Sequence, residues 1–152
     1  NARMFNIWET LTGVALSAEQ RINDGMIDID GLTMDEKVLV YADPDLIHQV
    51  AYNLLDNAVK FSFPKGKLTL KITSKAGKAY LSIGNQGETI PPDQLSHIFD
   101  RFHKADSSRS THKDGVGLGL YIVKPILNPY KEDITVTSQD GFTEFTFTLS
   151  EV

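Results

Sequence analysis

The stretch that decides the fold is Asn53-Leu-Leu-Asp-Asn-Ala-Val-Lys-Phe61, which lies in a segment that begins with Asp43 and Pro44. Asp is favoured just before a helix and Pro at its first position, so we predict a helix from Pro44 to Phe61. It should stop before Pro64. At 3.6 residues per turn, its apolar residues share one broad face. This predicted core face holds Ile47, Val50, Ala51, Leu54, Leu55 and Ala58.

The opposite face of this helix is polar and has an unusual composition. It holds Gln49, Asn53, Asp56, Asn57 and Lys60. Asn and Asp are poor helix formers, whereas ordinary solvent faces favour Glu, Lys, Arg and Gln. Carboxamide oxygens suit Mg²⁺ together with phosphate oxygens and waters, and a lysine can meet phosphate as a point charge. The face indicates a nucleotide site, with a solvated surface as the alternative.

The remaining pattern predicts an α+β fold. We expect one helix from Ile7 to Ile22, capped by Asn6 and closed by residues 23–25, and a helix over 116–127. Residues 92–101 should form a short helical piece inside a long loop over 84–115. Strands are expected at residues 26–29, 37–41, 67–74, 79–83, 134–137 and 142–149. Strands adjacent in sequence favour a mixed, mostly antiparallel sheet with about three helices on one face, a two-layer sandwich.

Two glycine segments flank the long loop. Gly115-Val-Gly-Leu-Gly119 opens the last predicted helix, where backbone N–H groups can approach an anion. Its spacing fits neither the dinucleotide fingerprint nor the P-loop. Gly84-Asn-Gln-Gly87 follows a strand, so that Asn85 could present its amide to a purine edge. An ordinary turn is the alternative for each segment.

Composition bounds the possibilities. The 152 residues fit one domain, which we place at 6–152, with 1–5 as the end of a linker. The chain has no cysteine, which excludes disulfides, a cysteine nucleophile and thiolate metal ligands. A net charge of −5 argues against a nucleic-acid partner. No run approaches the ~20 apolar residues of a membrane span, so we expect no direct membrane contact.

Four segments in order resemble the ATP-binding domain of sensor histidine kinases. Residues 53–61 look like its N box, 85–87 its first glycine box, 98–102 its F box and 115–119 its second glycine box. The resemblance implies the Bergerat α/β sandwich of the GHKL group, with a mobile ATP lid over about 102–114. The implied ligands are ATP and Mg²⁺.

The resemblance also implies roles for individual residues. Asn57, with Asn53 nearby, would hold Mg²⁺, and Lys60 and Arg101 would hold phosphates. The implied catalytic residues are Asn57, Lys60 and Arg101. The implied ATP-binding residues are Asn53, Asn57, Lys60, Phe61, Asn85, Gly87, Ile90, Phe102, Gly115, Gly117, Leu118, Gly119 and Thr143.

Three departures from the family pattern stand out. Asn85 replaces the usual Asp, which removes charge assistance from the adenine contact and predicts weaker nucleotide binding. Pro125 falls inside the last predicted helix, so a kink or an early end is expected. Residues 128–131 replace a short His-Gly turn.

The implied activity is transfer of the ATP γ-phosphoryl group to a histidine, in two-component signalling. Hydrolytic relatives carry a Glu base where this chain has Asn53, which cannot take a proton. His48, His97, His103 and His112 lack the context of a phosphoacceptor. The acceptor is therefore expected on a separate dimerisation domain. The alternatives are a non-catalytic nucleotide-binding or docking module, and an ATPase.

The remaining expectations concern surroundings. We expect this domain to be a cytoplasmic monomer in isolation, from a parent kinase that can be membrane-anchored. Its direct partner would be the dimerisation and histidine-phosphotransfer domain of the same kinase, and a response regulator would be an indirect partner.

Overall fold

The computed structural model describes residues 1–31, 37–100 and 119–152. Within them, seven strands form one sheet in the order β1-β3-β7-β5-β4-β2, with β6 paired to β7. β2 and β4 pair in parallel, and the other pairs are antiparallel. The strands are β1 Arg3–Asn6, β2 Asp28–Asp30, β3 Leu39–Ala42, β4 Lys67–Lys75, β5 Lys78–Gln86, β6 Ile134–Gln139 and β7 Phe142–Glu151. The predicted mixed, mostly antiparallel sheet is confirmed.

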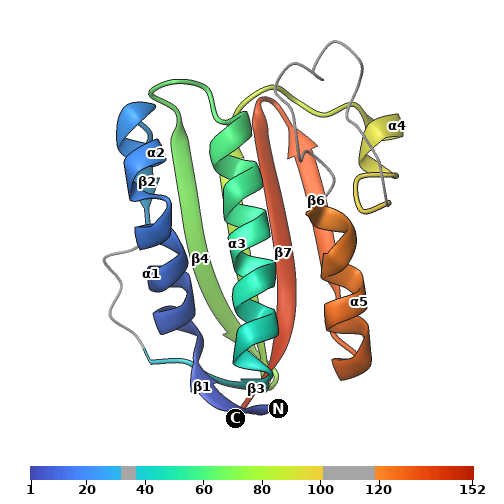
Figure 1. The fold of residues 1–152 in the computed structure, drawn as a ribbon. Coiled ribbons are helices and arrows are strands. Elements are labelled where there is room, and N and C mark those ends of the chain that lie inside the picture. Colours follow the sequence, from blue (N-terminus) through green and yellow to red (C-terminus); the bar gives the residue numbers. More distant parts are fainter. Residues whose placement is uncertain (32–36, 101–118) are drawn as a thin grey trace.

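The helices cover one face of this sheet. α1 (Ile7–Ser17), α3 (Pro44–Phe61) and α5 (Val123–Leu127) lie side by side across it, with α3 in the centre (Figure 1). This arrangement confirms the predicted two-layer sandwich.

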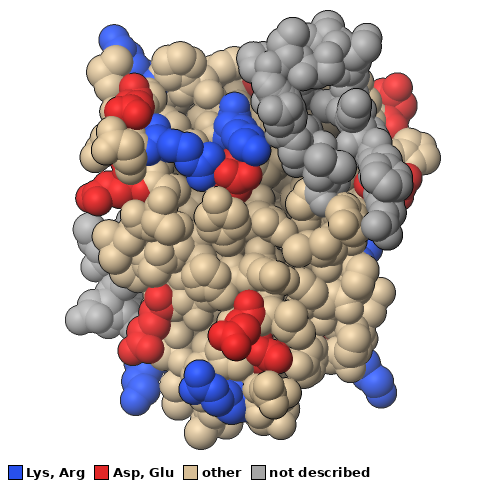
Figure 2. Space-filling model, in the orientation of Figure 1, with Lys and Arg blue, Asp and Glu red and all other residues tan. Residues whose placement is uncertain are grey.

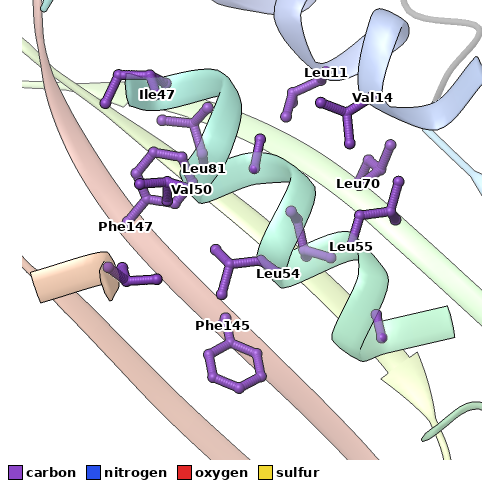
Figure 3. Packing of buried hydrophobic residues seen from close by; sticks show 14 of the residues in the cluster. Leu11, Val14, Ile47, Val50, Leu54, Leu55, Leu70, Leu81, Phe145 and Phe147 are labelled. Carbon is purple, nitrogen blue, oxygen red and sulfur yellow. The ribbon is translucent and has the colours of Figure 1, made fainter. Parts of the chain in front are cut away.

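The core fills the space between α3 and the sheet (Figure 3). On β7, Phe145, Phe147 and Leu149 are at most 1% exposed, which matches their alternation in sequence. All six residues of the predicted core face of α3 are also buried. Each large side chain contributes about 1.5–3 kcal/mol through burial.

The central helix begins and ends where the sequence predicts. The Asp43 carboxylate accepts hydrogen bonds from the backbone N–H groups of Asp45 and Leu46, at 3.0 and 3.4 Å. Ser62 leaves the helix with extended backbone angles. Local capping chemistry therefore sets the length of the element that carries the candidate site.

The first predicted helix is wrong in one respect, because it forms two helices. Asn6 caps α1 as expected, accepting from the Trp8 N–H at 3.1 Å. The helix ends at Ala18, whose N–H donates to the Ala15 carbonyl at 3.1 Å in a tighter, 3₁₀-type turn. A second helix, α2 (Glu19–Asp24), then follows. The sequence pattern carries no Gly or Pro that marks this break.

The N-terminal strands differ from the prediction in extent and partners. β2 starts at Asp28, because Met26 adopts a left-handed turn conformation with φ 53°. It pairs with β4, while β3 lies between β1 and β7. Arg3–Asn6, mostly within the predicted linker end, form β1 and pair with β3.

Within the described residues, which leave out 101–118, the two helices near the long loop are shorter than predicted. α4 spans only Pro92–Leu95. Where a helix was predicted over 116–127, a 3₁₀ turn covers Leu120–Ile122 and α5 covers Val123–Leu127. Pro125 is the third residue of α5, where its missing N–H would have no intrahelical partner in any case. The predicted early end is wrong, because α5 continues past Pro125 to Leu127, where the predicted helix ends.

Candidate nucleotide-binding site

The polar face of α3 joins the segment that leads into the last helix. The Asn53 side-chain amide donates a hydrogen bond to the Gly119 carbonyl at 3.0 Å. A Cβ on Gly119 would lie 3.2 Å from Asn53 Cγ, so a glycine allows this close approach. Asn57 lies one turn further along α3 and is half-buried. The structure therefore brings Gly119 to the predicted site helix.

A charged cluster, formed by Asp56 and Lys60 of α3 and Arg21 of α2, lies beside Asn57. Asp56 Oδ1 accepts from Arg21 Nη1 at 2.6 Å, and Asp56 Oδ2 lies 3.2 Å from Lys60 Nζ. Basic side chains flank an acidic one over α2 and the C-terminal end of α3 (Figure 2). Sequence reasoning missed Arg21, because it lies 35 residues before Asp56 and on another helix.

Asn85 and Thr143, two of the predicted site residues, lie next to each other on the sheet. They pair across β5 and β7 and are only 3% and 5% exposed. Core residues Ile83 and Phe145 pair two positions earlier and later, so Asn85 and Thr143 face the same helix-covered side. The sequence predicted that this strand ends at Ile83. The prediction is wrong, because pairing with both β4 and β7 extends β5 to Gln86.

Gly87 packs directly against the end of α3. A Cβ at this position would overlap the carbonyl oxygen of Phe61, the last residue of α3, and would lie 2.9 Å from Asn85 Nδ2. The Gly87 N–H donates to the Gly141 carbonyl at 2.9 Å. A glycine at this position therefore allows the end of β5 to approach the last turn of α3 closely.

A hydroxyl relay connects Thr143 to Ile90. The hydroxyl oxygens of Thr143 and Ser138 lie 2.7 Å apart, and the Ile90 N–H donates to Ser138 Oγ at 2.8 Å. Ile90 is 7% exposed. Ser138 was missed by sequence reasoning, although its position opposite Thr143 in a β-hairpin is a signal that could have found it.

The described part of the F box packs on the core. Ile98 is buried, and the Phe99 ring packs edge to face on the Phe145 ring, with 5.9 Å between the ring centroids. The Lys124 ammonium lies 5.0 Å from the Phe99 ring centre. The predicted site residues Arg101, Phe102, Gly115, Gly117 and Leu118, and the lid over 102–114, lie outside the described residues.

Two of the four histidines, His48 and His97, lie within the described ranges. His97 Nδ1 lies 2.8 Å from Asp100 Oδ2, and His48 is exposed on α3. His103 and His112 lie outside the described residues.

Together these groups offer complementary chemistry to a nucleotide. Buried amide and hydroxyl groups at the sheet edge suit a planar polar ring, and the carboxamides and ammonium of α3 suit phosphates and a hard cation. The match to known families decides the identity. The sequence model of one protein family, described as histidine kinase-, DNA gyrase B- and HSP90-like ATPase, matches residues 42–152. The chain belongs to this family.

Relatives of this domain include a heme sensor protein and a sensor histidine kinase. It is 38% identical over 107 residues to the heme sensor protein HssS of Staphylococcus haemolyticus, covering 70% of this chain and 23% of that protein. It is 36% identical over 109 residues to the sensor histidine kinase YkoH of Bacillus subtilis, covering 72% of this chain and 24% of that protein. The chain therefore spans about a quarter of the length of these relatives.

Solved structures place the domain among histidine-kinase catalytic domains. The catalytic domain of ThkA superposes with a TM-score of 0.84 and 26% identity, covering 99% of this chain and 96% of that one. Full-length ShkA in complex with AMPPNP superposes with a TM-score of 0.83 and 25% identity, and the match covers 100% of this chain and 32% of that one. The Bergerat sandwich predicted from sequence is confirmed.

No helix within the described ranges is long and apolar enough to cross a membrane.

Proposed function

We propose that this domain binds Mg-ATP between the polar face of α3 and the Asn85–Thr143 end of the sheet, and donates the γ-phosphoryl group to a histidine on a separate dimerisation domain. The observation that carries the proposal is the Asn53–Gly119 hydrogen bond. It ties the carboxamide face of α3 to the last residue of the glycine segment that would hold the phosphates.

The sheet side of the site fits an adenine ring. The buried Asn85 carboxamide has an oxygen that can accept from the adenine amino group, and Thr143 supplies a hydroxyl beside it. Phe61 and Ile90 would add apolar surface beside the base, and Gly87 would let the base lie close to the backbone. These residues bind and orient the base and take no part in the chemical step.

The donor set of α3 fits Mg²⁺ that arrives with phosphate. The described residues hold no cluster of three or more His, Cys, Asp or Glu that would bind a metal without a ligand. Asn57 supplies a half-buried carboxamide oxygen, and phosphate oxygens and waters would complete the shell. The metal would neutralise charge on the phosphates during transfer.

Phosphoryl transfer depends on positioning and charge, which this chain supplies through few groups. Lys60, together with Arg101, would hold the phosphates by charge. Asn53 cannot take a proton from water, and its amide donates to the Gly119 carbonyl. This favours transfer to a protein acceptor over hydrolysis.

The histidine acceptor and the downstream partner are proposed from the relatives. ThkA has been solved in complex with the response regulator protein TrrA, and the matched chain of that structure superposes on this chain with a TM-score of 0.80 and 26% identity. We extend this to a response regulator as the indirect partner of the present domain. We place the domain in the cytoplasm, as a monomer when isolated.

The nucleotide assignment is tested by thermal unfolding with and without Mg-ATP. Ligand at about 100 times its Kd adds about 2.7 kcal/mol, which raises Tm by roughly 5–10 °C for a domain of this size. Asn57→Ala should abolish this shift without destabilising the unliganded domain, because Ala is the better helix former. His48→Ala, an exposed position on the same helix, should keep the shift. An unshifted Tm at millimolar Mg-ATP would refute nucleotide binding.

The transfer step needs a second measurement. The chain alone with labelled ATP should remain unlabelled, whereas addition of the dimerisation domain of its parent kinase should give acid-labile phosphohistidine on the added domain. Binding of ATP without any phosphohistidine in this mixture would favour the non-catalytic module.

A further inference from the structure

The ion pair between Arg21 and Asp56 has no part in the function proposed so far. Arg21 comes from α2, and its guanidinium reaches across to the polar face of α3. Asp56 immediately precedes Asn57, the proposed Mg²⁺ ligand. The pair therefore lies beside the place where the phosphates would bind.

The Asp56 carboxylate is shared between two cations. Arg21 holds Oδ1 at 2.6 Å, and Lys60 approaches Oδ2 at the longer distance of 3.2 Å. The Asp56 side chain is 23% exposed, so water screens it only in part. The shorter, charge-assisted contact is the stronger of the two. Arg21 is thus the main partner of Asp56.

Without Arg21, Asp56 would act against the proposed site in two ways. Its negative charge would repel a triphosphate bound at Asn57, and it would hold the Lys60 ammonium, which should meet the phosphates, more strongly than it does with Arg21 present. With Arg21 present, two cations share one carboxylate, and the cluster retains one net positive charge.

We infer that Arg21 is a positioning residue of the ATP site, which neutralises Asp56 and so leaves Lys60 available to the phosphates. This inference rests on the proposed function, because it requires nucleotide binding at α3. It assigns to α2, which carries none of the recognised sequence boxes, a part in binding the anion.

The test is a comparison of Mg-ATP, Mg-ADP and AMP affinities by calorimetry on the whole 152-residue chain. Arg21→Gln should weaken ATP binding about threefold to tenfold at low salt, ADP less, and AMP by less than about twofold, because the effect follows ligand charge. It should fade in about 1 M salt. Arg21→Lys should restore most of the affinity.

Asp56→Asn separates charge from packing. If the inference is right, this variant tightens ATP binding, because it frees both cations, whereas loss of a merely structural α2–α3 contact would weaken it. Lys71→Gln is the matched control, since it removes a cation from an ion pair with Glu144 on β7 and should leave all affinities unchanged.

Three results would overturn the inference. These are unchanged ATP affinity in Arg21→Gln, an equal loss for ATP and AMP, or weaker ATP binding in Asp56→Asn. Failure of the proposed function looks different, because the unmodified chain itself would then bind no nucleotide. A melting curve of each unliganded variant shows whether that variant is folded. If Arg21→Gln does not fold, the ATP affinities of Arg21→Lys and Asp56→Asn still test the inference.

Discussion

The side-chain amide of Asn53 donates to the carbonyl oxygen of Gly119, 66 residues further along the chain. This bond joins the centre of α3 to the start of the 3₁₀ turn at Leu120–Ile122. The hydrogen bond uses the N–H of the Asn53 carboxamide, whereas the sequence predicted a role for the oxygen of that carboxamide. Asn53 therefore has a structural role before any ligand binds.

Asn53→Asp should expose that role. A carboxylate has no N–H to donate, so two acceptor oxygens would face each other, and we expect a loss of about 1–3 kcal/mol in the free energy of unfolding by urea. Asn53→Ala removes the bond without this repulsion and should cost less, about 1 kcal/mol. Equal stability of Asn53→Asp and the unmodified chain at neutral pH would contradict the assigned hydrogen bond.

Gly87→Ala should destabilise the domain through backbone contact. The added Cβ would overlap the Phe61 carbonyl and crowd the Asn85 amide, neither of which can move freely. We expect a loss of about 1–3 kcal/mol in the free energy of unfolding, and weaker ATP binding. Gly13→Ala is the control, because its Cβ would meet nothing within 4 Å. In the middle of α1 it should gain about 0.5–1 kcal/mol.

The sequence predicted those parts of the site that depend on local signals. The bounds of α3 follow from the Asp43-Pro44 start and the approach to Pro64, and its polar face follows from helical spacing. The Arg21–Asp56 pair escaped prediction, because it depends on how two separate helices pack. The Ser138–Thr143 contact is local to the β6–β7 hairpin, and it was missed because the cross-strand register within that hairpin was not predicted. The break at Ala18 escaped for a related reason, since tertiary packing overrides a continuous apolar period.

Asn85→Asp should tighten ATP binding several-fold. A carboxylate accepts the adenine amino group in a charge-assisted bond, which is roughly twice as strong as a neutral one. GTP affinity should not rise, since guanine presents a carbonyl at the corresponding position. The unliganded variant should be less stable, because Asn85 is 3% exposed and a buried carboxylate is costly. Parallel titrations of ATP and GTP check this, and equal gains for the two nucleotides would contradict adenine recognition by Asn85.

Glu132→Gln should lower stability while nucleotide affinity stays constant. The Glu132 side chain is 1% exposed, and its carboxylate accepts from Lys78 at 2.6 Å, Thr148 at 2.8 Å and Ser150 at 2.9 Å. Loss of one charged hydrogen bond costs about 1.5–3 kcal/mol, so a clear fall in the urea midpoint is expected. Thr148 and Ser150 lie toward the opposite end of β7 from Thr143, so the ATP site should be undisturbed.

Glu144→Gln provides the matched comparison on the same strand. Glu144 pairs with Lys71 at 3.6 Å, and the Lys71 side chain is 59% exposed, so this pair should contribute only about 0–1 kcal/mol. The two variants remove the same charge from the same chain and differ in burial. If their urea midpoints fell equally, net charge and not burial of the hydrogen-bonded carboxylate would explain the loss in Glu132→Gln.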